Sequence, residues 1–385
     1  MKYLERNARK LTNMNLNIAV LAGDGIGPEV TMQAIKTLKA IAVEFDHNFY
    51  FKNAPVGAIA IDETGNPLPE KTLELCEKSD AILFGAIGHP KYDNDPNAKV
   101  RPEQGLLALR KSLGLFANIR PVKAYNSLLD MSPLKKDIIA GTDISIYREL
   151  TGGIYFGEKQ LSKDLNTASD LCLYTREEIE RITHLAFEAA RGRRKKVTLV
   201  DKANVLESSR LWRRVVTEVG SSYEDIELDY LFVDNAAMQL ILNPKQFDVI
   251  LTENMFGDII SDEASVIGGS IGLLASASIG GSIGLFEPIH GSFPEGAGKG
   301  IANPIASILS AAMLLEHFGL KEEAQRVQDA VDKSLELEIT TPDLAKANKG
   351  LSTNQVGDFI EDYVLNPEDN KVNFTNIHLG QSTII

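Results

Sequence analysis

Short apolar runs alternate with longer amphipathic segments along most of this 385-residue chain. A continuous apolar run of about four to eight residues is typical of a strand buried on both faces, and apolar residues every three or four positions are typical of a helix. Strands are therefore predicted at residues 17–22, 81–87, 197–200 and 247–252. Helices are predicted at residues 28–43, 103–113, 175–191, 207–220, 303–318, 321–337 and 353–365. Such alternation of strands and helices predicts an α/β fold.

The pattern changes between residues 117 and 156, where strand signals dominate and helix signals are few. No Gly- or Pro-rich linker separates this stretch, so a second domain would have to be an insertion. We therefore expect a more β-rich inserted domain here. At the ends, residues 1–13 are expected to be a short disordered extension or an upstream start before Met14, and residues 366–385 a loosely packed polar tail.

Composition narrows the functional class. Hydrophobic residues make up 44% and charged residues 24% of the chain, as in ordinary soluble globular proteins. The net charge of −13 disfavours nucleic acid and anionic membrane as partners. Cys76 and Cys172 are the only cysteines, which fits a reducing cytoplasm. No apolar run approaches the roughly 20 residues of a membrane span.

Two aspartates, Asp258 and Asp262, stand four residues apart in the stretch NMFGDIISDE. On a helix they would lie one turn apart on the same face, where two like charges repel unless a cation lies between them. Hard oxygen ligands suit Mg²⁺ or Mn²⁺. Taken alone, the pair is more typical of a solvated acidic helix face, because charged runs are usually on the surface.

Three arginines accompany the apolar segments of this acidic protein. Arg110 lies on a predicted helix, and Arg120 and Arg148 end the apolar runs at residues 116–120 and 144–148. A guanidinium group grips a carboxylate through two parallel hydrogen bonds, so arginines in these places indicate a carboxylate ligand. Structural salt bridges are the alternative for each arginine.

Three further segments carry candidate chemistry. Tyr155, within TGGIYFG, is either a proton donor or a packed aromatic. Lys202 follows a predicted strand in VDKANV, where ligands bind in open α/β sheets, and is a feasible base or a surface lysine. Residues 287–304 form a Gly- and Pro-rich loop before a strong helix and could wrap a nucleotide, with Glu295 bridging ribose hydroxyls.

A first glycine loop, GDGIGPE at residues 23–29, lies between a predicted strand and a predicted helix. Its spacing is G-x-G-x-G rather than G-x-G-x-x-G, and no acidic residue closes a second strand about twenty residues later. This loop is therefore predicted to be a tight turn near a site and not a Rossmann dinucleotide fingerprint.

Together these segments resemble the isocitrate/isopropylmalate dehydrogenase family, and most closely its members that act on 3-isopropylmalate. The resemblance extends from about residue 17 to residue 359, and residues 254–273 match the family signature in order and spacing. It implies an α/β fold that is not Rossmann. Residues 1–114 and 269–385 would form a large cofactor-binding domain, and residues 115–268 an inserted domain for substrate binding and dimerisation.

The resemblance also implies a site in the cleft between the domains, shared between the two chains of a homodimer. Tyr155 and Lys202 would be catalytic. The substrate would contact Glu103, Leu106, Leu107, Arg110, Arg120, Arg148 and Asp234. Asp234, Asp258 and Asp262 would bind Mg²⁺ or Mn²⁺, with Asp234 and Lys202 reaching across from the partner chain. The dinucleotide would contact Pro90, Lys91, Glu103, Glu287, His290, Gly291, Ser292, Glu295, Ala302 and Asn303.

The implied reaction is an NAD-dependent oxidative decarboxylation of 3-isopropylmalate to 4-methyl-2-oxopentanoate in leucine biosynthesis. Leucines at 106 and 107 would pack an isopropyl group but could not satisfy a third carboxylate, which Glu103 would also repel. Leu107 could equally be a core residue. Glu295 would accept the ribose 2′-hydroxyl of NAD and repel the 2′-phosphate of NADP. The alternatives are a sibling enzyme acting on D-malate, tartrate or isocitrate, and a non-catalytic regulatory paralogue.

Two departures from the family pattern stand out. Residues 88–92 read GHPKY where the family usually has Gly-Gly-Pro-Lys-Trp, and Phe293 replaces a small residue beside the predicted nucleotide loop. Neither removes a group that the implied reaction needs, although Phe293 could alter the affinity for the cofactor.

Overall fold

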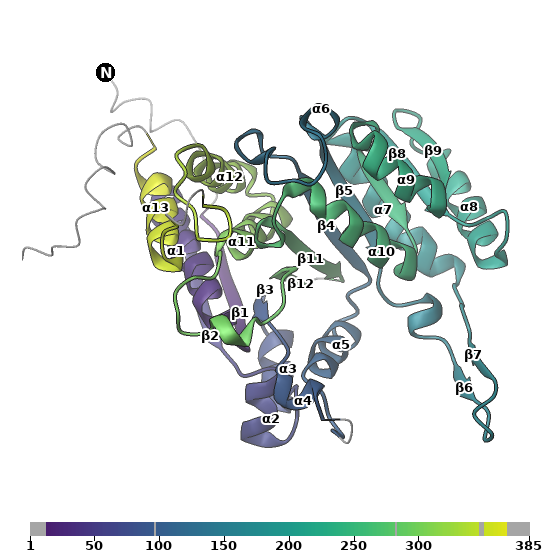
Figure 1. Cartoon of the computed structure of the whole chain (residues 1–385), viewed down its shortest axis with the longest axis horizontal. Helices are drawn as coiled ribbons and strands as arrows, with labels where there is room; N and C mark the ends of the chain where they lie inside the picture. The colour runs from purple at the N-terminus through teal and green to yellow at the C-terminus, as the bar shows by residue number, and fades with distance from the viewer. Residues whose placement is uncertain (1–12, 96–97, 282, 346–349, 368–385) are drawn as a thin grey trace, which may run out of the picture.

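Ten strands form one mixed sheet in this computed structural model, which describes residues 13–95, 98–281, 283–345 and 350–367 (Figure 1). The strand order is β2-β1-β3-β12-β11-β4-β5-β10-β8-β9. The strands are β1 (Asn15–Gly23), β2 (Asn48–Asn53), β3 (Ala81–Ala86), β4 (Ala117–Lys123), β5 (Asp143–Glu149), β8 (Lys196–Asp201), β9 (Glu227–Phe232), β10 (Val249–Thr252), β11 (Ala275–Gly280) and β12 (Ile283–Pro288). The α/β prediction is confirmed, and the mixed strand directions exclude a Rossmann sheet.

The sheet contains two parallel groups of strands that meet at an antiparallel seam. Strands β2, β1, β3 and β12 are parallel to one another, as are β5, β10, β8 and β9. Between the groups, β11 is antiparallel to both β12 and β4, and β4 is antiparallel to β5. The first group and β11 come from the two ends of the chain and the second group from its middle. This division supports the expected insertion, whose boundaries at residues 114/115 and 268/269 stay a prediction.

Helices cover both faces of each strand group (Figure 1). Beside the first group lie α1 (Gly27–Phe45), α2 (Ala58–Thr64), α3 (Glu70–Glu77), α4 (Pro90–Asp93), α5 (Glu103–Ser112), α11 (Ile305–His317), α12 (Lys321–Glu336) and α13 (Thr353–Leu365). Beside the second lie α6 (Lys136–Ile139), α7 (Arg176–Arg191), α8 (Glu207–Gly220), α9 (Val233–Leu242) and α10 (Asn254–Ser265). All seven helices predicted from periodicity are present, with ends that differ by one or two residues.

Burial explains why the strands read as continuous apolar runs. Every residue of β3 and of β10 is buried, because helices cover both faces of the sheet there. The longer helices present one apolar face to the sheet, as in α8, where Trp212, Val215, Val216 and Val219 are buried. Each strand group therefore has its own core on either side of the sheet.

A two-stranded hairpin, β6 (Lys159–Leu161) and β7 (Ala168–Asp170), extends away from the second strand group as an arm (Figure 1). All six of its paired residues are exposed, and so are the apolar side chains of Leu161, Leu165, Leu171 and Leu173. An isolated hairpin with exposed leucines is marginally stable in water. The arm is therefore a surface on which another chain could pack.

In the described part of the chain, no helix is both long and apolar enough to cross a lipid bilayer. The expectations for residues 1–13 and 366–385 fall almost entirely outside the described residues. The cytoplasmic location stays a prediction.

Candidate active site

The helix that carries the two aspartates begins immediately after β10, so its first turns lie at the carboxyl end of the strands. Arg148, near the end of the neighbouring strand β5, places Nη1 2.5 Å from Oδ1 of Asp258. Its Nε donates to the backbone oxygen of Asn254 at 2.9 Å, and its Nη2 donates to the side-chain oxygen at 2.8 Å. Burial lowers the pKa of Arg148 to about 10, so it remains cationic at neutral pH.

Gly257 explains how Arg148 can lie so close to the helix. A Cβ atom added to this glycine would be 2.6 Å from Cγ of Arg148 and 2.9 Å from a methyl group of Thr252. A larger residue would push the guanidinium group away from the carboxylate of Asp258. Close packing against Arg148 and Thr252 therefore explains why the signature segment has a glycine at position 257.

A second arginine pairs with the second aspartate. Arg120 on β4 donates from Nη1 to Oδ1 of Asp262 at 2.9 Å and to the hydroxyl of Ser261 at 2.6 Å. Its Nη2 also lies 3.9 Å from Oδ1 of Asp258. The structure thus brings both arginines and both aspartates of the predicted site together, and the aspartates lie one helical turn apart as expected.

Tyr155 completes this group from a short 3₁₀ turn (Gly153–Tyr155) before the arm. Its hydroxyl donates to Oδ2 of Asp258 at 2.8 Å, and the guanidinium carbon of Arg148 lies 5.8 Å from its ring centroid. Desolvation and then the bond to Asp258 raise the pKa of Tyr155, so the phenol keeps its proton at neutral pH. Tyr155 is 44% exposed, so its ring is not fully packed, and its role as a proton donor stays a prediction.

Arg110 lines a cleft of about 160 Å³ at the ends of β3 and β12, beside the seam strands β4 and β11. Its walls come from the end of β3, α5, β4, β11 and the segment after β12, and they include Leu106, Arg110, Arg120, Glu287, His290 and Gly291. Nη2 of Arg110 is 2.5 Å from Oε1 of Glu287. Two buried polar atoms of this cleft lack a protein partner, Nε of Arg110 and Nε2 of His290. Such unpaired atoms are costly, so they favour a polar ligand in the cleft.

Lys202 and Asp234 form a separate pair. Nζ of Lys202 lies 2.6 Å from Oδ1 of Asp234, and this hydrogen bond lowers the pKa of the carboxyl. Lys202 follows β8 and Asp234 opens α9, and neither is hydrogen-bonded to the cluster around Asp258 in the described part of the chain. Within one chain, the predicted site residues therefore form two separate groups, the Lys202–Asp234 pair and the cluster around Asp258.

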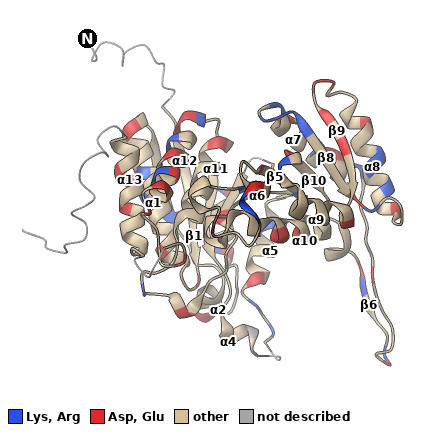
Figure 2. Cartoon of the chain, turned by 45° about the horizontal axis from the view of Figure 1, so that its top comes forward, with Lys and Arg blue, Asp and Glu red and all other residues tan. Residues whose placement is uncertain are grey.

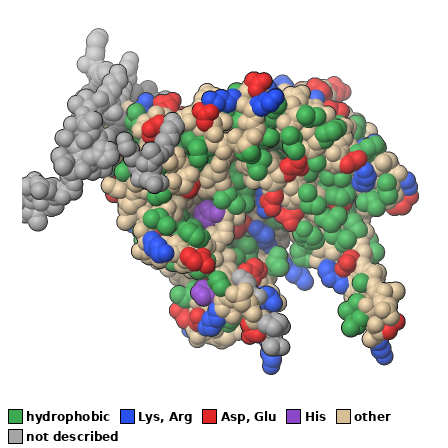
Figure 3. Space-filling view, in the orientation of Figure 1, with side chains coloured by type: hydrophobic (Ala, Val, Ile, Leu, Met, Phe, Trp, Pro, Cys, Tyr) green, Lys and Arg blue, Asp and Glu red, His purple; other side chains and the backbone are tan. Residues whose placement is uncertain are grey.

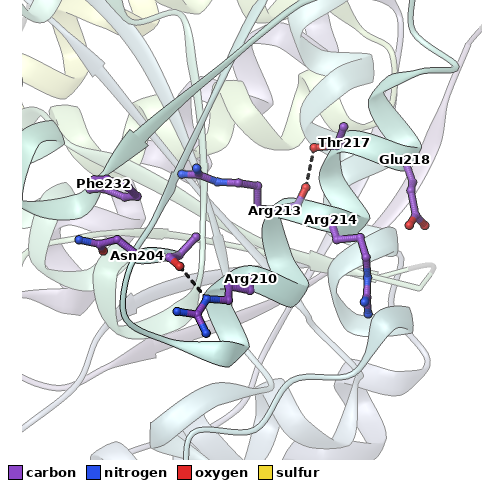
Figure 4. A pocket seen from close by; sticks show the side chains of 8 residues that line it. Asn204, Arg210, Arg213, Arg214, Thr217, Glu218 and Phe232 are labelled. Atoms are coloured by element: carbon purple, nitrogen blue, oxygen red, sulfur yellow. Dashed lines mark hydrogen bonds between the residues drawn. The ribbon is translucent and has the colours of Figure 1, made fainter.

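The turn that carries Lys202 is held by arginines of α8. Arg213 makes two 2.9 Å bonds to Asp201, and Arg210 donates to the backbone oxygen of Ala203 at 3.0 Å. Figure 4 shows Arg213 extending toward Phe232, whereas Arg214 points away from the turn. Figure 2 shows α8 as a basic helix beside the acidic strand β9. These contacts fix the backbone of the turn and leave the Lys202 side chain to reach Asp234.

Of the residues predicted to bind the dinucleotide, Glu287, His290 and Gly291 line the cleft beside Arg110, and the others do not. Gly291 and Glu295 are exposed, Ser292 is buried, and Ala302 and Asn303 are buried just before α11. Asn303 donates to Asp343 at 3.1 Å. Pro90 begins α4, and Nζ of Lys91 is 2.5 Å from Asp62. Burial lowers the pKa of His290, which favours a neutral imidazole.

The two leucines of α5 that are expected to select the substrate lie in different surroundings. Leu106 is part of the cleft wall, whereas Leu107 is 50% exposed. The interpretation of Leu107 as a core residue is therefore wrong. Glu103 is exposed in the first turn of α5, and its carboxylate faces Gly88, where an added Cβ would lie 3.0 Å from Oε1.

The donor set fits a divalent cation only in part. Asp258 and Asp262 offer hard oxygen atoms one turn apart, a common arrangement for Mg²⁺ or Mn²⁺ that also use substrate and water as ligands. Within the described residues, no group of three or more His, Cys, Asp or Glu side chains is arranged to hold a metal ion. A third carboxylate ligand from Asp234 of the partner subunit stays a prediction.

Two important residues escaped the sequence reasoning. Asn254 anchors Arg148, and Glu253 is 4% exposed with one carboxylate oxygen lacking a partner. Desolvation, followed by the charges of Asp201 and Glu149, raises the pKa of Glu253 to about 7. Both residues open the aspartate helix directly after a buried strand, and that position is the sequence signal that could have found them.

Known proteins share the sequence and the fold of this chain. The profile of the isocitrate/isopropylmalate dehydrogenase family matches residues 17–360. The chain is 53% identical over 352 residues to the 3-isopropylmalate dehydrogenase of Bacteroides fragilis (strain YCH46), covering 91% of this chain and 99% of that protein. It is 56% identical over 357 residues to the 3-isopropylmalate dehydrogenase of Geobacillus kaustophilus (strain HTA426), covering 91% and 96%.

Among solved structures, the isocitrate dehydrogenase from Methylococcus capsulatus matches with a TM-score of 0.81 at 36% identity, covering 91% of this chain and 99% of that one. The chain belongs to the isocitrate/isopropylmalate dehydrogenase family. The resemblance inferred from residues 254–273 and the predicted family fold are confirmed.

Proposed function

We propose that the protein is an enzyme that converts (2R,3S)-3-isopropylmalate and NAD⁺ to 4-methyl-2-oxopentanoate, CO₂ and NADH in leucine biosynthesis. Identities of 53% and 56% to relatives named 3-isopropylmalate dehydrogenase support this substrate. The observation that carries the proposal is the convergence of Arg120, Arg148 and Tyr155 on Asp258 and Asp262. This arrangement suits a dicarboxylate that carries a hydroxyl group.

The three arginines grip the substrate carboxylates. Arg110, Arg120 and Arg148 are anchored through Glu287, Asp262 and Asp258, so their guanidinium groups are held in position before the substrate arrives. Preorganised charged donors lose little conformational entropy on binding. The unpaired Nε of Arg110 is one donor available to a carboxylate.

Asp258 and Asp262 would hold a Mg²⁺ or Mn²⁺ ion, which would neutralise the negative charge that develops on the C2 oxygen, and NAD⁺ would accept the hydride from C2. Lys202 of the partner subunit, with its amine unprotonated, would take the proton of the C2 hydroxyl, directly or through a water. After CO₂ leaves, Tyr155 gives its phenolic proton to C3. Its raised pKa suits an acid that must still carry its proton at neutral pH.

Leu106 supports a substrate with an apolar substituent, since it lies in the cleft wall between Arg110 and the end of β3. An isopropyl group packed there would gain about 1–3 kcal/mol over a bare malate. A third carboxylate would meet an apolar wall and the charge of Glu103. D-malate, tartrate and isocitrate are therefore the weaker candidates.

We further propose a homodimer with shared sites. Figure 3 shows apolar side chains gathered on the face formed by α9 and α10, where Met238, Ile241, Leu242, Ile259 and Val266 are each at least 40% exposed. Ile259 lies directly beside Asp258, so the surface that would bind a second chain borders the proposed metal site. The partner's Lys202 and the partner's Asp234 would then complete the site and add a third carboxylate to those of Asp258 and Asp262.

The test is an assay of NADH formation with Mg²⁺, NAD⁺ and one of three substrates, 3-isopropylmalate, D-malate or isocitrate. We expect the highest kcat/KM for 3-isopropylmalate. A preference for D-malate or isocitrate would contradict the substrate assignment and would show that the α5 face does not select an isopropyl group.

A further inference from the structure

The first glycine loop, residues 23–29, packs between the end of β3 and the residues that follow β12. The backbone N–H of Asp24 donates to the oxygen of Ala86 at 2.8 Å, and that of Ile26 donates to the oxygen of Ser292 at 2.8 Å. Gly25 has φ of +57°, and an added Cβ would lie 2.0 Å from the Ser292 oxygen. Only glycine permits this approach, so the loop is built to hold its neighbours closely.

Asp24 binds the start of α2 and the residues that follow β3. Its buried carboxylate accepts backbone N–H bonds from Ala58 at 2.9 Å, Ile59 at 3.1 Å and Gly88 at 3.0 Å. It therefore caps α2, whose own N-cap residue makes no side-chain bond, and ties this helix to the segment that leads into α4.

Glu29 binds the adenosine loop, defined here as residues 291–303. Its two carboxylate oxygens accept from the backbone N–H of Gly298 and, at 3.2 Å, from that of Gly300. Charge-assisted bonds of this kind are about twice as strong as neutral ones. Glu29 is 269 residues from Gly298 in sequence, so the contact exists only in the fold.

The adenosine loop is thereby anchored near both ends. Ile26 holds Ser292, Glu29 holds Gly298 and Gly300, and the hydroxyl of Thr353 donates to the oxygen of Ala302 at 2.6 Å. Glu295, which is proposed to bind the ribose 2′-hydroxyl, lies exposed between these anchors. Its position depends on how firmly the anchors hold.

We propose that Glu29 is a positioning residue that sets the shape of the adenosine loop before the dinucleotide binds. This inference rests on the proposed function, which assigns the loop to NAD. A loop already held in its bound shape loses less conformational entropy on binding. Without Glu29, two backbone donors lose their acceptor and the loop must be ordered by the cofactor itself.

The experiment compares Glu29→Gln and Glu29→Asp with Glu44→Gln in the full-length protein. Glutamine can accept one N–H but presents a donor to the other, and aspartate is too short by one methylene. Glu44, at the other end of α1, is also partly buried and is a matched control for the loss of one charge. Two quantities are measured: hydrogen exchange of residues 291–303 without dinucleotide, and the Kd of NADH from its fluorescence.

For both Glu29 variants we expect faster amide exchange confined to the loop and a Kd about tenfold weaker, with kcat at saturating NAD⁺ nearly unchanged. Glu44→Gln should match the wild type in both measurements. Unchanged exchange would overturn the inference, and so would faster exchange with an unchanged Kd. If the wild type itself failed to bind NADH, the proposed function would fall, while the exchange data would still report whether Glu29 holds the loop.

Discussion

The hydroxyl of Tyr155 donates a 2.8 Å hydrogen bond to Oδ2 of Asp258, while Arg148 binds the other oxygen of that carboxylate. Asp258 thus binds both the proposed proton donor, Tyr155, and Arg148, which is proposed to bind a substrate carboxylate. A cation or a substrate that engaged Asp258 would change the surroundings of Tyr155 and Arg148 together. The first two predictions follow from this contact.

Replacing Tyr155 with phenylalanine should lower kcat by about 10²–10³-fold, because proton transfer by a positioned side chain contributes on that order. The ring is partly exposed, so the fold should survive. Stopped-flow kinetics should show a first turnover of NADH at close to the wild-type rate, followed by slow product formation. A kcat within a few-fold of the wild type would exclude the tyrosine as the acid.

Replacing Asp258 with asparagine should abolish turnover, because the side chain keeps its shape but loses the charge that a divalent cation requires. Thermal unfolding should remain cooperative and CD spectra unchanged. A chelator should inactivate the wild type reversibly, and added Mg²⁺ should restore it. Substantial activity in Asp258→Asn, or none lost with chelator, would contradict the metal assignment.

Mixing two inactive variants should restore activity if the sites are shared. In a dimer of Lys202→Met with Asp258→Asn, one site carries both defects and the other carries neither. Random exchange of chains would give about a quarter of wild-type activity. Each variant mixed with itself is the control. Recovery near zero after proven chain exchange would place Lys202 in the same site as the Asp258 of its own chain.

Glu295→Lys should shift the cofactor preference toward NADP. An acid near the ribose 2′ position accepts a hydroxyl and repels a phosphate, and a lysine reverses both effects. The ratio of kcat/KM for NAD⁺ to that for NADP⁺ should fall by about 10²-fold, or roughly 2.7 kcal/mol. Glu295→Gln, which removes only the repulsion, should shift the ratio less. An unchanged ratio in the lysine variant would show that Glu295 does not contact the ribose.

Stability should fall as pH rises through neutrality because of Glu253. Burial raises its pKa to about 7 in the folded protein from 4.5, so the folded state binds this proton more tightly than the unfolded state. Its stabilising contribution is complete below about pH 4.5 and is lost as pH rises through about 7, an effect on the order of 3 kcal/mol. Glu253→Gln should remove that loss, so the Tm difference between pH 5.5 and 8.5 should be smaller than in the wild type. Parallel pH profiles would contradict this reasoning.

Local pattern was enough to predict much of this protein. The alternation of apolar runs and amphipathic segments predicted seven helices and the α/β class, since periodicity reflects which face of an element is buried. The spacing of Asp258 and Asp262 predicted a shared helix face, and the failed G-x-G-x-x-G spacing correctly argued against a Rossmann fold. Leu107 could not be decided, because its neighbours in sequence do not reveal whether the helix face meets solvent.

The sequence by itself determined the longer helices, several buried strands, the family and the residue types of the site, because these depend on side-chain order within short stretches. Only the tertiary structure decided which groups meet. It paired Lys202 with Asp234 apart from Asp258, buried Glu253 at the start of the aspartate helix, and brought Glu29 to Gly298. Such contacts depend on how the strands order themselves in the sheet, and strand order is set by packing between segments that are distant along the chain.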